Sequence, residues 1–177
     1  MFIDYLDTPL GLFEFMATEQ GICQAIFCGD QQTQSKVNDI TALCKLQLIE
    51  YFAGQRTVFT VPLDPKGTLF QQTVWSCLAT IPFGAIKSYG AIAKMLNKPK
   101  AAQAVGGANG RNPITLIVPC HRVIGGDGSL TGYAGGIERK LWLLNHEGVE
   151  IKQSNTNTKL DIKNVIKKRQ DKTKFLR

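Results

Sequence analysis

The chain of 177 residues is long enough to bury a hydrophobic core and to form one domain or two small ones. Apolar residues make up 44% and charged residues 20%, as in an ordinary globular protein, and no apolar run is long enough to cross a bilayer. The N-terminus has no basic region ahead of an apolar one, so we expect no signal peptide and a location in the reducing cytoplasm.

The net charge of +7 is unevenly distributed along the chain. Residues 1–86 carry four Lys/Arg against eight Asp/Glu, whereas residues 87–140 carry eight against two. Residues 151–177 hold nine Lys/Arg against two Asp/Glu, and this polar composition predicts a flexible basic tail. The basic second half favours a polyanionic partner, nucleic acid first, although a solvated basic surface would have the same composition.

The first half of the chain predicts strands followed by a helix. Short runs at 12–17 and 22–28 are separated by turn residues, which is typical of strands. From about residue 35 to residue 52, apolar residues recur on one helical face. Residues 57–63 are rich in β-formers and predict another strand, after which the prolines and glycine within 62–67 mark a linker.

The second half predicts a series of helices. Apolar residues repeat at helical spacing over 70–81. Ser88 is a candidate cap for a short helix that ends near 97–99, and a second short helix starts at Lys100. Two short helices separated by a tight turn resemble a helix-turn-helix. A last helix is predicted over 137–145.

The second helix of this pair consists almost entirely of small residues. Such a stripe is by itself more often a packing face, but here cations precede and follow it. A helix of small residues between cations fits a narrow groove, with lysines on phosphates, whereas readout in the major groove needs Arg, Asn or Gln at base edges. Gln103 is the only such residue in the stripe, so we expect largely sequence-independent contact with the minor groove of double-stranded DNA. The residues assigned to this contact are Lys100, Ala101, Ala102, Gln103, Ala104, Gly106, Gly107, Arg111 and Arg122.

Five cysteines are an odd number and cannot all pair, and most are expected to be buried small hydrophobes. Cys23 and Cys28 lack a partner motif with zinc-ligand spacing, so we expect no metal site and no cofactor.

Cys120 differs from the other cysteines because it lies in the motif Pro-Cys-His-Arg at 119–122. The thiolate is the nucleophilic form, and a neighbouring base or cation makes it available near neutral pH. Neighbours in an extended segment point in opposite directions, so His121 is expected to act on Cys120 indirectly, through water. Either His146 or Glu147 can orient His121, and the chemistry alone does not choose between them.

Four segments carry a resemblance to a known family. They are residues 100–113, residues 117–124 with Pro-Cys-His-Arg, the run Thr-Gly-Tyr-Ala-Gly-Gly at 131–136, and Trp-Leu-Leu-Asn-His-Glu-Gly at 142–148. These segments resemble the O6-alkylguanine-DNA alkyltransferases, densely over 68–148 and only in outline over the N-terminal half.

The resemblance implies an α+β fold with two domains and a tail. Residues 1–66 would form a small α/β, ribonuclease H-like domain with antiparallel strands, and residues 67–150 a helical domain containing the helix-turn-helix. Residues 151–177 would remain a basic tail outside the resemblance, and we hypothesise that it compensates for Gln103 through non-specific phosphate contacts. The partner implied is double-stranded DNA, no cofactor is required, and the protein is expected to act as a monomer away from membranes.

The resemblance also implies a single-use reaction. The protein would flip an O6-alkylguanine, or an O4-alkylthymine, out of the duplex, and Cys120 would take its alkyl group irreversibly. By resemblance, His121 is the base and Glu147 orients it, Asn112 braces the loop, and Tyr89 donates a proton to the leaving base. The pocket would be lined by Val118, Tyr133 and Ala134.

One residue departs from the family pattern. The family usually has an arginine where this chain has Gln103, and that arginine fills the space left by the flipped base. Glutamine is shorter and uncharged, so we expect weaker DNA binding and slower flipping with intact thiol chemistry.

Three rival interpretations make different predictions. A cysteine hydrolase would turn over repeatedly. A transcription regulator would carry base-reading side chains in its second helix, which this chain lacks. A non-catalytic binder of damaged bases would be expected to lack the reactive cysteine, which is present here as Cys120.

Overall fold

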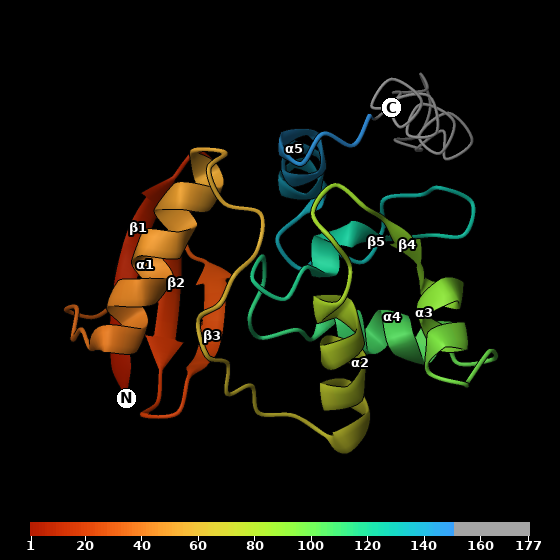
Figure 1. Cartoon of the computed structure of the whole chain (residues 1–177), viewed down its shortest axis with the longest axis horizontal. Helices are drawn as coiled ribbons and strands as arrows, with labels where there is room; N and C mark the ends of the chain where they lie inside the picture. The colour runs from red at the N-terminus through yellow and green to blue at the C-terminus, as the bar shows by residue number, and fades with distance from the viewer. Residues whose placement is uncertain (151–177) are drawn as a thin grey trace, which may run out of the picture.

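The computed structural model describes residues 1–150, and the predicted basic tail at 151–177 lies outside the described residues. Figure 1 shows a small sheet with one helix on its face beside a group of helices. The sheet and its helix come from the N-terminal third of the chain, and the helical group comes from the remainder. The predicted α+β fold class is confirmed.

The N-terminal sheet is antiparallel, with the order β1-β2-β3. Its strands are β1 (Phe2–Thr8), β2 (Gly11–Ala17) and β3 (Ile22–Phe27). Alternate residues of β2 are buried, Phe13, Phe15 and Ala17 among them, as the period of two requires for a strand with one face on the core. The predicted strands at 12–17 and 22–28 are therefore confirmed to within a residue.

Helix α1 (Asp39–Phe52) packs on this sheet and begins about four residues later than predicted. The Asn38 side chain accepts a hydrogen bond from the backbone of Thr41, whose hydroxyl accepts one from the backbone of Asn38. The preceding backbone is used by the sheet instead, because Lys36 exchanges two hydrogen bonds with Ile3 of β1. A residue paired with a strand cannot also start the helix.

The strand predicted over 57–63 does not form and is reduced to a single bridge between Ile22 and Leu63. The buried side chain of Gln47 on α1 supplies the reason. Its amide oxygen accepts hydrogen bonds from the backbone N–H groups of Thr60 and Val61, which a strand would have given to a neighbour. The segment is extended, but a side chain satisfies its backbone in place of a ladder.

The second half of the chain forms the predicted series of helices. They are α2 (Leu69–Ala79), α3 (Tyr89–Met95), α4 (Ala102–Gly110) and α5 (Ile137–His146). Ser88 caps α3 as expected, accepting a hydrogen bond from the backbone of Ala91. Helices α3 and α4 are joined by a short turn and pack on each other and on α2, where the Trp75 indole donates to the carbonyl of Ala108.

Two short strands connect the helices to the segment that bears the cysteine. Strand β4 (Lys87–Ser88) pairs in parallel with β5 (Val123–Ile124), directly after a 3₁₀ turn, η1 (Cys120–Arg122). Since β4 leads directly into α3 and β5 follows η1, the pairing fixes the start of α3 beside the cysteine turn.

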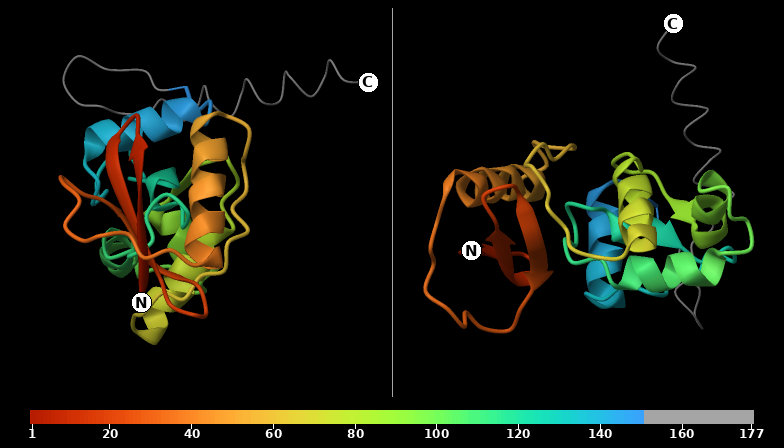
Figure 2. Two further views of the ribbon diagram at one scale, coloured as in Figure 1. Left: turned by 90° about the vertical axis from the view of Figure 1, so that its left-hand side faces the viewer. Right: turned by 90° about the horizontal axis from the view of Figure 1, so that it is seen from below.

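The sheet and the helical group share one hydrophobic core. Strand β3 also bonds the chain that leads into the cysteine turn, because the backbone of Ala25 donates to Pro113 and accepts from Thr115. The right-hand view of Figure 2 shows the two parts side by side, and in the left-hand view the sheet lies in front of the helical group. Within residues 1–150, no helix combines the length and the apolar character needed to span a membrane.

Candidate active site

Cys120 opens the 3₁₀ turn η1 and is almost entirely buried, with 2% of its surface exposed. The apolar stretch from Ile114 to Val118 brings the chain to this point through the core. Leu116 within it has a φ of +72°, in the left-handed region that a bulky side chain rarely adopts. Such a conformation persists only where the surroundings hold it, so the loop before the cysteine is fixed and strained.

The Asn112 side chain stabilises this loop by hydrogen bonds to its backbone. Its side-chain amide donates to the carbonyls of Val118, at 2.9 Å, and Ile114, at 3.3 Å, and its oxygen accepts from the backbone of Ile114 at 3.0 Å. The side chain is buried, so these bonds are protected from water. Asn112 therefore connects the two ends of the turn that presents Cys120.

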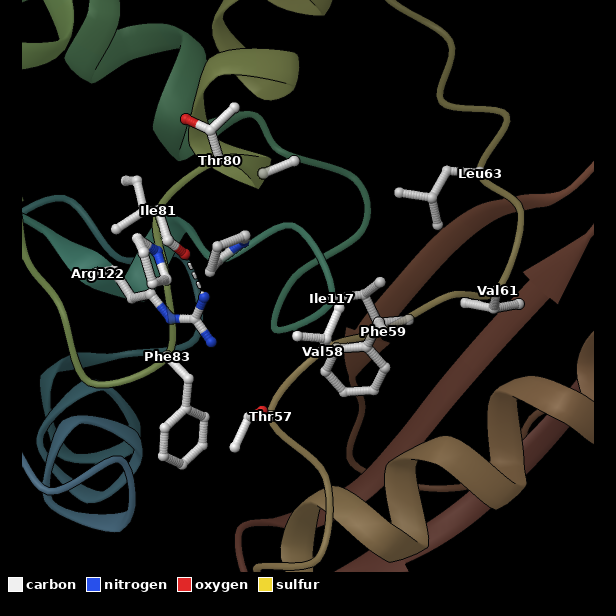
Figure 3. Close-up of a pocket in the computed structure, with 13 residues that line it drawn as sticks. Thr57, Val58, Phe59, Val61, Leu63, Thr80, Ile81, Phe83, Ile117 and Arg122 are labelled. Atoms are coloured by element: carbon white, nitrogen blue, oxygen red, sulfur yellow. Dashed lines mark hydrogen bonds between the residues drawn. The ribbon is translucent and has the colours of Figure 1, made fainter.

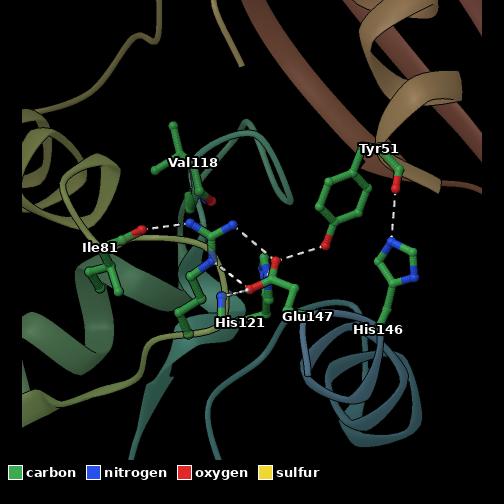
Figure 4. Close-up of polar contacts among 9 residues, drawn as sticks. Tyr51, Ile81, Val118, His121, His146 and Glu147 are labelled. Atoms are coloured by element: carbon green, nitrogen blue, oxygen red, sulfur yellow. Dashed lines mark hydrogen bonds and ion pairs between the residues drawn. The ribbon is translucent and has the colours of Figure 1, made fainter. Parts of the chain in front are cut away.

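The buried carboxylate of Glu147, just after α5, is the centre of the polar network in Figure 4. Its Oε1 accepts hydrogen bonds from the Tyr51 hydroxyl, His121 Nε2 and Arg122 Nη2 at 2.8, 2.8 and 2.9 Å. Its Oε2 accepts from Arg122 Nε at 2.8 Å and from the backbone of Gly84 at 3.2 Å. Burial opposes ionisation, but the hydrogen bonds from His121 and Arg122 hold the pKa of Glu147 far below its usual range.

This geometry determines the state of the His121 ring. The ring is fully buried, and burial lowers its pKa, although the hydrogen bond to Glu147 acts in the opposite direction. The imidazole is therefore neutral near pH 7. Because ionised Glu147 only accepts, Nε2 must carry the proton and Nδ1 the lone pair. Nδ1 has no hydrogen-bond partner among the described residues and is available as a base.

The structure also chooses between the two residues that the sequence left as partners of His121. Glu147 contacts His121, whereas His146 Nε2 donates to the backbone carbonyl of Tyr51 at 2.8 Å. The His146 ring stacks on Trp142 at a centroid distance of 4.9 Å. His146 thus connects α5 to the end of α1.

Burial also raises the pKa of the Cys120 thiol, while the Asn112 hydrogen bond and the charge of Lys140 act in the opposite direction. Lys140 on α5 is fully buried, and its Nζ donates to the carbonyls of Val123, at 2.6 Å, and Thr131, at 2.9 Å. Within residues 1–150 no carboxylate forms an ion pair with Lys140, so its buried charge is costly, and burial lowers its pKa to about 8. It provides a positive charge for a thiolate at Cys120.

The segment at 131–136 lies over the cysteine turn and is held by several donors. The Tyr89 hydroxyl donates to the Thr131 carbonyl at 2.8 Å, and Lys140 donates to the same carbonyl. Gly132 leaves room for the Tyr89 hydroxyl, because a Cβ on residue 132 would lie 2.5 Å from that oxygen. Tyr133 is buried, with its ring 6.4 Å from that of His121, and Ala134 is exposed. Val118 is buried behind the turn.

Figure 3 shows a separate cavity of about 530 Å³ at the junction of the two parts of the molecule. The extended segment with Val58 and Phe59 forms one wall, and Ile81, Phe83 and Arg122 form the other. Neither Cys120 nor Tyr133 lines it. This cavity is therefore not the space in front of the thiol.

The exposed face of α4 carries the small residues that the sequence assigned to DNA. Gln103, Ala104 and Gly107 are exposed on one side of the helix, with Ala102 and Gly106 partly covered. Lys100 precedes them and Arg111 follows, both exposed. The exposed residues among them, together with residues of α2, line a shallow depression.

Arg122 does not belong to this surface. It was assigned to phosphate contact on its charge, but it is 6% exposed and its guanidinium bonds Glu147 and the carbonyl of Ile81. We therefore leave it out of the DNA surface. Its position shows that it compensates the charge of the buried carboxylate.

Sequence reasoning missed two residues of the site, Tyr51 and Lys140. Tyr51 is 96 residues away from Glu147 in the sequence and lies on α1, so no local motif indicated it. Lys140 is in the last helix among surface-like charges. A lysine in phase with Leu143 and Leu144 on an amphipathic helix was the available signal.

No metal centre is apparent in the described part of the chain, where no three His, Cys, Asp or Glu residues gather closely enough to hold an ion. Cys23 and Cys28, the sequence pair considered for zinc, are separate free thiols on the sheet and its edge.

The fold and the site together define a two-part protein with a buried cysteine, a neutral histidine base and an ionised carboxylate beside a helix of small residues. Two models of one family match the chain: the ribonuclease-like domain of 6-O-methylguanine DNA methyltransferase over residues 1–65, and its DNA binding domain over residues 69–149. The chain belongs to the 6-O-methylguanine DNA methyltransferase family.

Individual relatives agree with this family. A methylated-DNA--protein-cysteine methyltransferase of Shigella flexneri is 56% identical over 58% of this chain and 60% of its own length, and one of Mycobacterium bovis is 61% identical over 57% and 61%. The aligned region thus spans about 60% of the length of these relatives. The structure of Mycobacterium tuberculosis OGT in complex with DNA superposes with a TM-score of 0.75 at 44% identity, covering 82% of this chain and 91% of the other.

Replacement of Lys140 by Met tests the cost of the buried ammonium group. The pKa of Lys140 is about 8 in the folded protein, against an ordinary 10.5, so the folded protein binds this proton more weakly than the unfolded chain. Burial of the charged lysine therefore destabilises the fold below pH 8 by on the order of 3 kcal/mol. This cost is relieved as the pH rises from 8 to 10.5, because the folded protein loses the proton first. Urea denaturation at several pH values should show the free energy of unfolding of the wild type rising relative to Lys140→Met across this range.

Lys87→Met, which changes an exposed lysine, is the matched control and should show no such rise. A difference between the wild type and Lys140→Met that does not vary with pH would contradict the assignment of a buried, charged lysine.

Proposed function

We propose that this protein repairs alkylated DNA by transferring the alkyl group of O6-alkylguanine, and of O4-alkylthymine, to the sulfur of Cys120. The observation that carries the proposal is the buried chain of groups that starts at Cys120. The neighbouring His121 is neutral, with its Nε2–H on an ionised Glu147 and its Nδ1 available as a base. Such an arrangement activates a thiol for attack on carbon.

The comparisons support the substrate class. Relatives that are 56% and 61% identical are named methylated-DNA--protein-cysteine methyltransferases. A structural neighbour, Schizosaccharomyces pombe Atl1, is described in complex with damaged DNA containing O6-carboxymethylguanine, at 33% identity and a TM-score of 0.50 over 56% of this chain and 95% of the other.

The proposed reaction is an in-line displacement at the alkyl carbon. His121 takes the thiol proton through a bridging water, and the sulfur forms a bond to the alkyl carbon as the carbon–O6 bond breaks. The guanine leaves with the electron pair and receives a proton from the Tyr89 hydroxyl. Asn112 keeps the turn in place, while Val118, Tyr133 and Ala134 border the base. No metal or cofactor takes part in these steps.

The reaction is single-use in this proposal because its product is a thioether. Water hydrolyses an acyl-enzyme but not a thioether carbon–sulfur bond, so the cysteine is not regenerated. Each molecule therefore repairs one base. A hydrolase built on the same three side chains would instead turn over.

The DNA surface is proposed on the exposed side of α4. Gln103, Ala104 and Gly107 present little bulk to a groove, and Lys100 and Arg111 at its ends reach phosphates. We propose that this helix enters the minor groove largely without sequence preference and that the damaged base is flipped toward Cys120. The protein would act as a monomer in the cytoplasm.

The proposal is tested by mass spectrometry after incubation with duplex DNA that carries O6-methylguanine. We expect the mass of one methyl group on the peptide that contains Cys120, in an amount equal to the protein consumed. The peptide that contains Cys77, a partly buried free thiol, should be unmodified. Repeated turnover, or an unmodified Cys120 peptide while the lesion disappears, would overturn the proposal.

Gln103→Arg tests the contribution of the α4 surface to base flipping. Arginine is longer and charged, so we expect repair of O6-methylguanine in duplex DNA to accelerate by about tenfold, equivalent to ~1.4 kcal/mol. Free O6-benzylguanine needs no flipping, and its reaction rate should change by less than about twofold.

Gln72→Arg adds the same charge to an exposed residue of α2 outside the depression on α4, and should not accelerate repair. An unchanged rate on duplex DNA in Gln103→Arg, or equal acceleration in both variants, would show that the residue at 103 does not assist flipping.

A further inference from the structure

The N-terminal domain contributes a side chain directly to the catalytic network. Tyr51 lies in the last turn of α1, and its hydroxyl donates to Glu147 Oε1 at 2.8 Å. Figure 4 shows this bond crossing from the N-terminal helix to the end of α5. The other four hydrogen bonds to the Glu147 carboxylate come from residues 84–122, all within the region 69–149 that the DNA binding domain model matches.

Tyr51 and His121 donate to the same carboxylate oxygen. Both bonds are 2.8 Å long, and both side chains are fully buried. Because each donor withdraws negative charge from Oε1, the Tyr51 hydroxyl weakens the attraction of Glu147 for a proton on His121. The tyrosine thus has a means to adjust the basicity of the histidine that no purely structural residue would have.

The position of Tyr51 is itself closely determined. His146 Nε2 donates to its backbone carbonyl at 2.8 Å, and its ring packs against Phe52, Phe59 and Phe83. Beside these contacts, the junction of the two domains contains the cavity of about 530 Å³ in Figure 3, so packing there is incomplete. The contacts of Tyr51 are therefore a specific connection between the domains.

We propose that Tyr51 is a positioning residue of the alkyl-transfer site, through which the N-terminal domain orients Glu147 and limits the basicity of His121. The inference rests on the proposed function for the meaning of the rate, but its effect on His121 is independent of any substrate. The charged groups that act on His121 are Glu147, Arg122 and Lys140. Two further titratable groups lie beside it, the adjacent Cys120 and Tyr133, whose ring is 6.4 Å from the imidazole.

Tyr51→Phe removes only the hydroxyl and is the test variant. With one donor fewer on Oε1, Glu147 attracts the His121 proton more strongly, so the pKa of His121 measured by NMR titration should rise. The less restrained carboxylate should lower the maximal rate of benzyl transfer from free O6-benzylguanine by roughly 3- to 10-fold. Because burial lowers this pKa, a loosened site that admits water would raise it in a Glu147→Gln background as well, whereas loss of the Tyr51–Glu147 hydrogen bond would not.

Tyr5→Phe is the matched control, because it deletes the hydroxyl of another buried tyrosine of the same domain, on β1 opposite Glu14 and outside the hydrogen bonds of Glu147. It should leave the pKa of His121 and the rate unchanged. An unchanged or lowered pKa in Tyr51→Phe, or an equal effect in both variants, would overturn the inference.

A double-mutant cycle shows whether Tyr51 acts through Glu147. In a Glu147→Gln background, Tyr51→Phe should cause no further loss of rate, whereas an equal loss in both backgrounds would overturn the inference. If the wild type transfers no alkyl group to Cys120, the proposed function fails, and the pKa of His121 in the two tyrosine variants still decides the role of Tyr51.

Discussion

The rest of the structure depends on the buried negative charge of Glu147. A carboxylate without exposure to water is stable only when hydrogen-bond donors surround it, and here five donors come from α1, from the turn after α2, and from η1. Arg122 supplies two of them and balances the charge. The ends of these distant elements therefore meet at Glu147, which contacts His121, the residue after the cysteine.

The N-terminal sheet then acts as a support for a strained loop. Strand β3 forms hydrogen bonds with the backbone of Pro113 and Thr115, the residues directly before and after the buried Ile114. Asn112 connects this chain to Val118, and Leu116 is held between them with its positive φ. Fixing the backbone in advance places the thiol without an entropy cost at the time of reaction. The N-terminal sheet thus helps to fix the loop that leads to Cys120.

The parts of this account that the sequence predicted are those encoded locally. Helices with clear periodicity and caps, and the motif at 119–122, were identified because their residues are neighbours in the chain. The strand at 57–63 failed because a glutamine 13 residues upstream of Thr60 satisfies its backbone, and β-propensity does not register such a partner. Arg122 was misassigned because charge does not indicate burial. Tyr51 was missed because its partner Glu147 lies 96 residues away in the sequence, so no local pattern connects the two.

Glu147 holds His121 as a neutral base with its lone pair on Nδ1. Nitrogen-15 NMR of the imidazole in the resting protein at pH 7 measures this directly, because protonated and unprotonated ring nitrogens have distinct chemical shifts. We expect a proton on Nε2 and none on Nδ1. A charged imidazolium, or a neutral ring with its proton on Nδ1, would contradict it.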